Sequence, residues 1–170
     1  MSRSLMGHAF AHHVWATNQL LDACLPLTSE QLDTAVPGTY GSILETLRHL
    51  VVGDAGYLFD ITGERTLGTD EDPSDLPGLR AAVEATGAAW WRLLGEDLDP
   101  DAVVHEVDPD DGYERYAPVG IRLAQALHHG SDHRSQICTA LTMLGLTPPA
   151  IDVWDYGVQT GRIVEVLPKT

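Results

Sequence analysis

The chain has 170 residues, of which 44% are hydrophobic, and this is enough for one domain with a full core spanning residues 1–170. Its 25 acidic and 10 basic residues leave a formal net charge of −15. A surface of this sign repels phosphate backbones and anionic lipid, so we expect neither a nucleic-acid partner nor a membrane partner.

The same composition predicts a cytoplasmic protein. The residues after Met1 do not resemble a signal peptide, and no apolar run approaches the roughly 20 residues that span a membrane. Two cysteines, Cys24 and Cys138, cannot make a disulfide framework, and we expect both to be packed, reduced thiols.

Amphipathic helices separated by connections that contain proline or glycine account for most of the chain. Their apolar residues recur at intervals of three and four, which is typical of helices that bury one face. Ser42 with Glu45 three residues later is the capping-box pattern of a helix N-terminus. The predicted helical segments are, in chain order, residues 4–25, a short turn at 28–32, 42–63, 77–98, 119–144 and 150–160.

The stretch between the third and fourth long helices has a different pattern. Residues 103–107 and 113–116 flank a turn at 108–112 and predict two short strands. Long helices with short connections favour an all-α fold, an antiparallel four-helix bundle with a short β-hairpin before the fourth helix and a C-terminal helix. In such bundles, sites form between facing helices.

Two histidines in the fourth long helix are the most informative residues for function. His129 and His133 are four positions apart, which places both imidazoles on one face, one turn apart, where they can share a metal ion. Their neighbours indicate a mostly buried helix, in which a free imidazole needs a partner. The alternatives are a chance pair on the surface or one imidazole bonded to the other.

A third histidine, His49, lies among leucines in the second long helix. Taken alone, such a residue is more often a core histidine satisfied by a hydrogen bond than a metal ligand. On a helix predicted to pack beside the His129–His133 pair, it becomes the expected third ligand. Three protein ligands and an open position are the pattern of a reactive metal site.

The other five histidines fit different roles. His8 and His12 are also four apart, but they lie in the polar stripe of the first helix. His13 and His128 would point about 100° away from better-placed neighbours on the helix wheel. His105 is expected on the surface of a strand. No phosphate loop, Cys-x-x-Cys or serine elbow competes, and the lack of a Glu-x-x-His repeat disfavours a di-iron carboxylate bundle.

Three segments, in this order, resemble the DinB-like (DinB/YfiT) superfamily of metal-dependent proteins. They are Trp15–Leu21, Gly41–Leu50 and His129–Ile137. The resemblance spans essentially the whole chain, and it implies a four-helix bundle, often homodimeric, in which three histidines hold a divalent ion, zinc or nickel among others. Carried over position by position, the implied ligands are His49, His129 and His133.

The resemblance also implies a reaction. Similar proteins include enzymes that use a small thiol such as mycothiol or bacillithiol, as S-transferases or as a maleylpyruvate isomerase. The leading hypothesis is therefore a divalent-metal-dependent enzyme that activates a small thiol for transfer to a small electrophile, because a metal ion lowers the pKa of a bound thiol. A metal-dependent hydrolase that activates water is one alternative. A stress-related helical protein with a structural or sensory ion and no catalysis is another.

One position departs from the family pattern. Similar proteins often carry a second histidine directly before the last ligand, where this chain has Asp132. The ligand His133 is retained, so the expected metal site is unaffected. We expect the carboxylate of Asp132 to change the charge or a contact beside the site.

Overall fold

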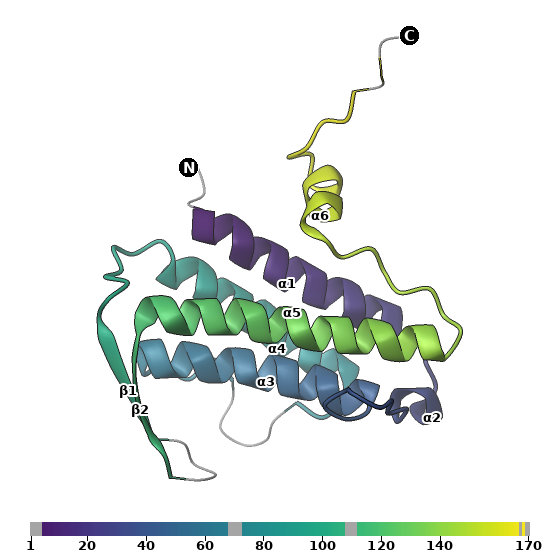
Figure 1. The fold of residues 1–170 in the computed structure, drawn as a ribbon, viewed down its shortest axis with the longest axis horizontal. Coiled ribbons are helices and arrows are strands. Elements are labelled where there is room, and N and C mark those ends of the chain that lie inside the picture. The colour runs from purple at the N-terminus through teal and green to yellow at the C-terminus, as the bar shows by residue number, and fades with distance from the viewer. Residues whose placement is uncertain (1–4, 68–72, 108–111, 167, 169–170) are drawn as a thin grey trace.

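The computed structural model describes residues 5–67, 73–107, 112–166 and 168, and its long helices form the expected four-helix bundle (Figure 1). The prediction of a helical fold with a short β-hairpin before the fourth long helix and a helix at the C-terminal end is confirmed. The elements are α1 (Leu5–Cys24), α2 (Ser29–Leu32), α3 (Ile43–Thr62), α4 (Leu76–Leu93), β1 (Val103–Val107), β2 (Glu114–Pro118), α5 (Val119–Met143) and α6 (Val153–Gln159).

The bundle is built from two antiparallel pairs. Helix α3 packs against α5 and α1 packs against α4, while contacts of α1 with α5 and of α3 with α4 close the ring. The paired helices run in opposite directions, whereas α3 and α4 run in the same direction (Figure 1). This order, which needs one long crossover between α3 and α4, is a known form of the four-helix bundle.

Two clusters of buried apolar side chains form the core. One gathers around Leu47, Leu50 and Ile137, and the other gathers around Phe10 and Trp90. Along each long helix, the positions between the two clusters hold buried polar residues instead. These residues are His13 and Thr17 on α1, Asp54 on α3, Thr86 on α4, and His133 and Arg134 on α5.

The start of α3 follows the sequence prediction closely. The Ser42 hydroxyl accepts the backbone N–H of Glu45, and the Glu45 carboxylate accepts the backbone N–H of Ser42 at 2.8 Å. Hydrogen bonds from the backbone and the side chain of Ser42 to this carboxylate favour its charged form and lower the pKa of Glu45. Gly63 ends the helix in the left-handed conformation, with φ of 70°.

Two helix boundaries differ from the prediction by more than one residue. Helix α4 ends at Leu93 rather than at residue 98, since Gly95 is a poor helix former and the acidic Glu96 and Asp97 would face the negative end of the helix dipole. Helix α6 begins at residue 153 rather than at residue 150 because the side chain of Asp152 accepts the backbone N–H of residue 155 and caps the helix there.

The hairpin pairs β1 with β2 in an antiparallel register that places His105 opposite Tyr116. The second strand begins one residue later than predicted and continues to Pro118, whereas residues 108–111 of the predicted turn lie outside the described residues. Among the helices in the described part of the chain, none combines the length and the apolar content needed to cross a membrane.

Candidate metal site

The structure brings the three predicted ligands together between α3 and α5. One ring nitrogen each of His49, His129 and His133 lies within 4.8 Å of the others. The ring centroids are 4.4 to 4.9 Å apart, and the Nε2 atoms of His49 and His129 approach to 3.0 Å. Within residues 5–67, 73–107, 112–166 and 168, this is the one group of three or more such donors that could hold a metal ion.

A glycine on α3 makes this approach possible. If residue 53 had a side chain, its Cβ would lie 2.9 Å from Cε1 of His129. Such a contact is closer than van der Waals distance, so either the imidazole or the helix would have to move. Gly53 therefore gives the ring of His129 the space in which it meets His49.

Gln136 fixes the orientation of His133. Its side-chain Oε1 lies 2.9 Å from the backbone nitrogen of Tyr40 and 3.1 Å from Nδ1 of His133. A backbone N–H can only donate, so the Gln136 atom that faces both groups is its oxygen, and the Nδ1 of His133 carries the proton. The lone pair of His133 is consequently on Nε2, the nitrogen that remains for a metal ion.

Aromatic side chains enclose the histidines. The ring of Tyr40 stacks on His49 at a centroid distance of 3.9 Å and an interplanar angle of 12°, and the edge of Tyr57 packs against His129. An open cavity of about 560 Å³ lies beside His49, between the loop before α3 and the helix itself. Its lining residues are Tyr40, Gly41, Glu45, Arg48, His49, Val52 and Gly53. Of the three histidines, His49 lines this cavity, so a small molecule can approach His49 from this side.

Burial keeps two of the imidazoles neutral. It lowers the pKa of His129 to about 4, with further lowering by the neighbouring His133 and His49. Burial and the charge of His133 also lower the pKa of His49. Since imidazole binds a metal only in its neutral form, both rings are ready to bind at pH 7. Three imidazole nitrogens are a donor set that suits zinc or nickel, so the residues fit the expected divalent ion.

The other histidines lie outside the cluster, as the sequence predicts. His8 and His128 are exposed, and His105 is exposed on the hairpin, where it stacks on Tyr116. His12 bonds through Nε2 to the backbone carbonyl of Ile151 at 2.8 Å. His13 does not belong to the cluster; it is fully buried and contacts Asp54, which the sequence did not reveal.

Sequence reasoning missed most of the residues that surround the ligands. Gln136 lies three positions after His133 on the same helix face, so its spacing was a usable signal. Tyr40 comes from a loop and Gly53 acts through the space it leaves, so neither had a signal in the helix pattern. Asp132, the departure from the family pattern, is exposed.

Comparison with known proteins agrees with the observed fold. A solved structure with the same fold is the crystal structure of a DinB-like protein from Bacillus cereus ATCC 10987, which is 20% identical, with a TM-score of 0.65 over 89% of this chain and 100% of that chain. No curated protein matches the sequence. The family model described as the DinB family matches residues 1–163, and the chain therefore belongs to the DinB family.

Proposed function

We propose that His49, His129 and His133 hold one divalent metal ion, zinc or nickel, and that the protein is a metal-dependent enzyme that activates a small thiol for transfer to a small electrophile. The observation that carries this proposal is the convergence of three imidazole nitrogens within 4.8 Å, beside an open cavity. Membership of the DinB family supports the metal.

The donor count favours a reactive site over a structural one. A structural zinc ion takes four protein ligands, whereas the cluster in the described part of the chain offers three. A divalent ion bound there would leave one position for a thiol or a water molecule and would lower its pKa. The protein side chains would hold the ligands in place, with Gln136 fixing His133 and Tyr40 shielding one face of His49.

A cosubstrate screen on metal-loaded protein tests this function. Protein purified without a histidine tag and loaded with zinc or nickel is mixed with a reactive alkylating electrophile, either without thiol or with one thiol at a time, and loss of the electrophile and of the thiol is measured. We expect turnover with one thiol class, its disappearance with a chelator and its return with the ion. Turnover without any thiol would favour the hydrolase, and stoichiometric metal without turnover would favour the structural or sensory ion.

The family resemblance also predicts a homodimer. Sedimentation equilibrium of the metal-loaded protein measures the mass directly, and a mass of twice the 18.4 kDa chain is expected. A monomer at micromolar concentration would contradict the proposal of a dimer and would leave the metal site unaffected, since all three histidines belong to one chain.

A further inference from the structure

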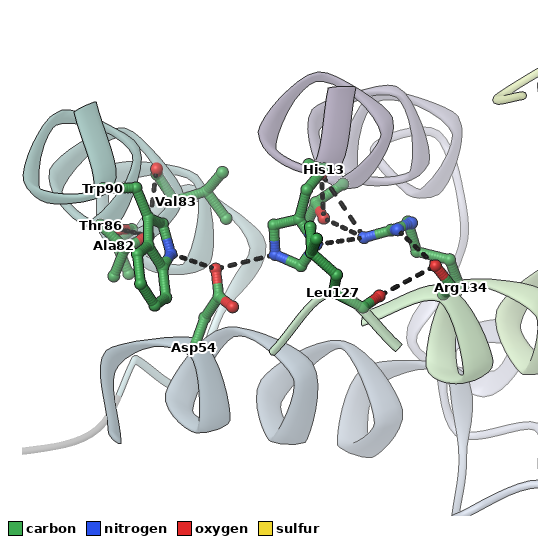
Figure 2. Close-up of polar contacts among 10 residues, drawn as sticks. His13, Asp54, Ala82, Val83, Thr86, Trp90, Leu127 and Arg134 are labelled. Atoms are coloured by element: carbon green, nitrogen blue, oxygen red, sulfur yellow. Dashed lines mark hydrogen bonds and ion pairs between the residues drawn. The ribbon is translucent and has the colours of Figure 1, made fainter. Parts of the chain in front are cut away.

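A buried carboxylate lies in the polar layer between the two apolar clusters. Asp54, on α3, is only 6% exposed. Its Oδ2 atom accepts a hydrogen bond from Nε2 of His13 at 2.9 Å and another from the indole nitrogen of Trp90 at 3.2 Å (Figure 2). The carboxylate of α3 is thus held by side chains from α1 and α4.

The chain of contacts continues to the helix that carries two of the histidines. On the other side of the His13 ring, Nδ1 lies 3.1 Å from the guanidinium of Arg134 (Figure 2). Arginine can only donate, so the Nδ1 of His13 accepts and its Nε2 carries the proton that goes to Asp54. Each hydrogen bond in the series Trp90, Asp54, His13 and Arg134 therefore has a defined donor and acceptor. Arg134 directly follows the proposed ligand His133 in the sequence.

The residue after His129 on α5 is a glycine, and it makes room for the contact of His13 with Arg134. A Cβ on Gly130 would lie 2.7 Å from Nδ1 of His13 and 2.9 Å from the guanidinium of Arg134. Only a glycine leaves the space in which these side chains meet. The position of α5 beside His129 is thus tied to the buried polar chain.

Asp54, in this series of hydrogen bonds, and His129, in the histidine cluster, each have a buried polar atom without a hydrogen-bond partner in the described part of the structure. Oδ1 of Asp54 and Nδ1 of His129 are both buried, and neither has a hydrogen-bond partner among the residues that the structure describes. Gly53, the residue before Asp54, packs against the ring of His129. A buried acceptor and a buried nitrogen therefore lie on adjoining parts of α3 and α5.

We propose that Asp54 is a positioning residue for the metal ligand His129: its free Oδ1 accepts the Nδ1–H of His129, directly or through one buried water, when Nε2 faces the ion. This inference rests on the proposed metal site. Histidines that bind a metal almost always donate their other N–H to a carboxylate, a carbonyl or a water, and loss of that partner typically lowers metal affinity by about 10–100-fold. The contacts with His13, Trp90 and Arg134 hold the carboxylate in place for this role.

The variant Asp54→Asn tests the role without changing the size of the side chain. Its amide oxygen can still accept from His13 and Trp90, but its NH₂ would then face the Nδ1–H of His129, and two donors cannot bond. We expect zinc affinity, measured by competition with a chromogenic chelator, to fall by about 10–100-fold. Asp60→Asn is the matched control, because Asp60 is also a partly buried carboxylate of α3 but pairs with Arg122, and its zinc affinity should equal that of the wild type.

A spectroscopic measurement separates positioning from a purely structural role, and it does not depend on the variant folding. In the zinc-loaded wild type, the Hδ1 proton of His129 should give a slowly exchanging, strongly downfield resonance in ¹H–¹⁵N spectra. In Asp54→Asn, this resonance should move upfield and exchange faster. Wild-type affinity in Asp54→Asn, or a freely exchanging Hδ1 in the wild type, would overturn the inference. Failure of the wild type to bind zinc would overturn the metal site itself, and the role of Asp54 with it.

Discussion

Helices α1 and α5 each carry two histidines four residues apart, yet only one of these pairs belongs to the metal-site candidate. On α1, His8 is exposed and His12 bonds to the backbone carbonyl of Ile151. On α5, His129 and His133 face α3, which supplies His49 and leaves space at Gly53. Spacing is a property of one helix, whereas a site also requires the helix that faces it.

Burial alone does not separate the two pairs. It lowers the pKa of His12 as well as that of His129. The difference lies in what the nitrogen atoms meet. Nε2 of His12 is taken by a carbonyl oxygen, while Nε2 of His129 faces another imidazole at 3.0 Å. A convergence of ring nitrogens, rather than a low pKa, is what makes the α5 pair a candidate for metal binding.

The largest expected effect comes from removing one histidine of the α5 pair. His133→Ala or His129→Ala should lower metal affinity by more than about 100-fold, because a lost ligand costs more than the 10–100-fold of a lost supporting contact. Metal content by mass spectrometry of the dialysed protein measures this, and circular dichroism checks that the helices remain.

The α1 pair provides the control for that experiment. His8→Ala and His12→Ala should retain stoichiometric metal, since neither imidazole belongs to the cluster. Full metal occupancy in the His129→Ala, His133→Ala double variant would refute the assignment. An empty site in His12→Ala would show that α1 supplies a ligand and would remove the contrast between the helices.

The pH dependence of stability offers a second test of the contrast, in metal-free protein. His129 has a pKa of about 4 when folded and about 6.5 when unfolded, so the unfolded chain binds the extra proton between these values. Stability should therefore be fully present above pH 6.5 and fall as the pH drops toward 4, by at most about 1.4 kcal/mol per pH unit for this group. Urea titrations at each pH measure the slope.

Substitution assigns that slope to one helix or the other. His129→Gln should flatten the dependence more than His12→Gln, because the hydrogen bond of His12 with Ile151 raises the pKa of His12 and offsets part of its lowering by burial. If the unfolding free energy depended on pH equally in both variants, His12 and His129 would contribute equally to the pH dependence of stability.

Moving the facing helix should weaken the site without removing a ligand. In Gly53→Ala, the new Cβ would press on Cε1 of His129 at 2.9 Å, and we expect metal affinity to fall about tenfold, within the range of supporting-contact losses. Gly56→Ala, one turn further along α3, meets open space and should bind metal normally while gaining up to about 1 kcal/mol of stability. Unchanged metal affinity in Gly53→Ala would show that α3 can shift enough to accommodate the new Cβ.

The sequence predicts what is encoded within one helix and misses what is shared between helices. The capping box at Ser42 and the spacing of His129 and His133 are local patterns, and both appear in the structure. The contact of His13 with Asp54 joins residues 41 positions apart. A helix wheel separates His13 from His12, but it cannot identify the carboxylate that His13 meets, because that depends on how the four long helices pack together.

The smallest expected effect concerns orientation. The α5 pair has an oxygen that fixes one of its rings, because Gln136 accepts the Nδ1–H of His133 at 3.1 Å and so leaves the lone pair on Nε2. In Gln136→Ala, the ring can rotate and exchange tautomers, and part of the population presents the wrong nitrogen. Metal affinity should fall by about tenfold or less, at the lower end of the range for supporting contacts.

Gln125→Ala is the matched control, since this glutamine of α5 bonds to the hydroxyl of Tyr57 and to none of the three histidines. Chelator competition on both variants, with ¹H–¹⁵N spectra to report the tautomer of His133, measures the effect. If His133 keeps its proton on Nδ1 and its affinity without Gln136, then convergence of the three rings is sufficient by itself, and the contrast between the α1 and α5 pairs rests entirely on the helix that faces them.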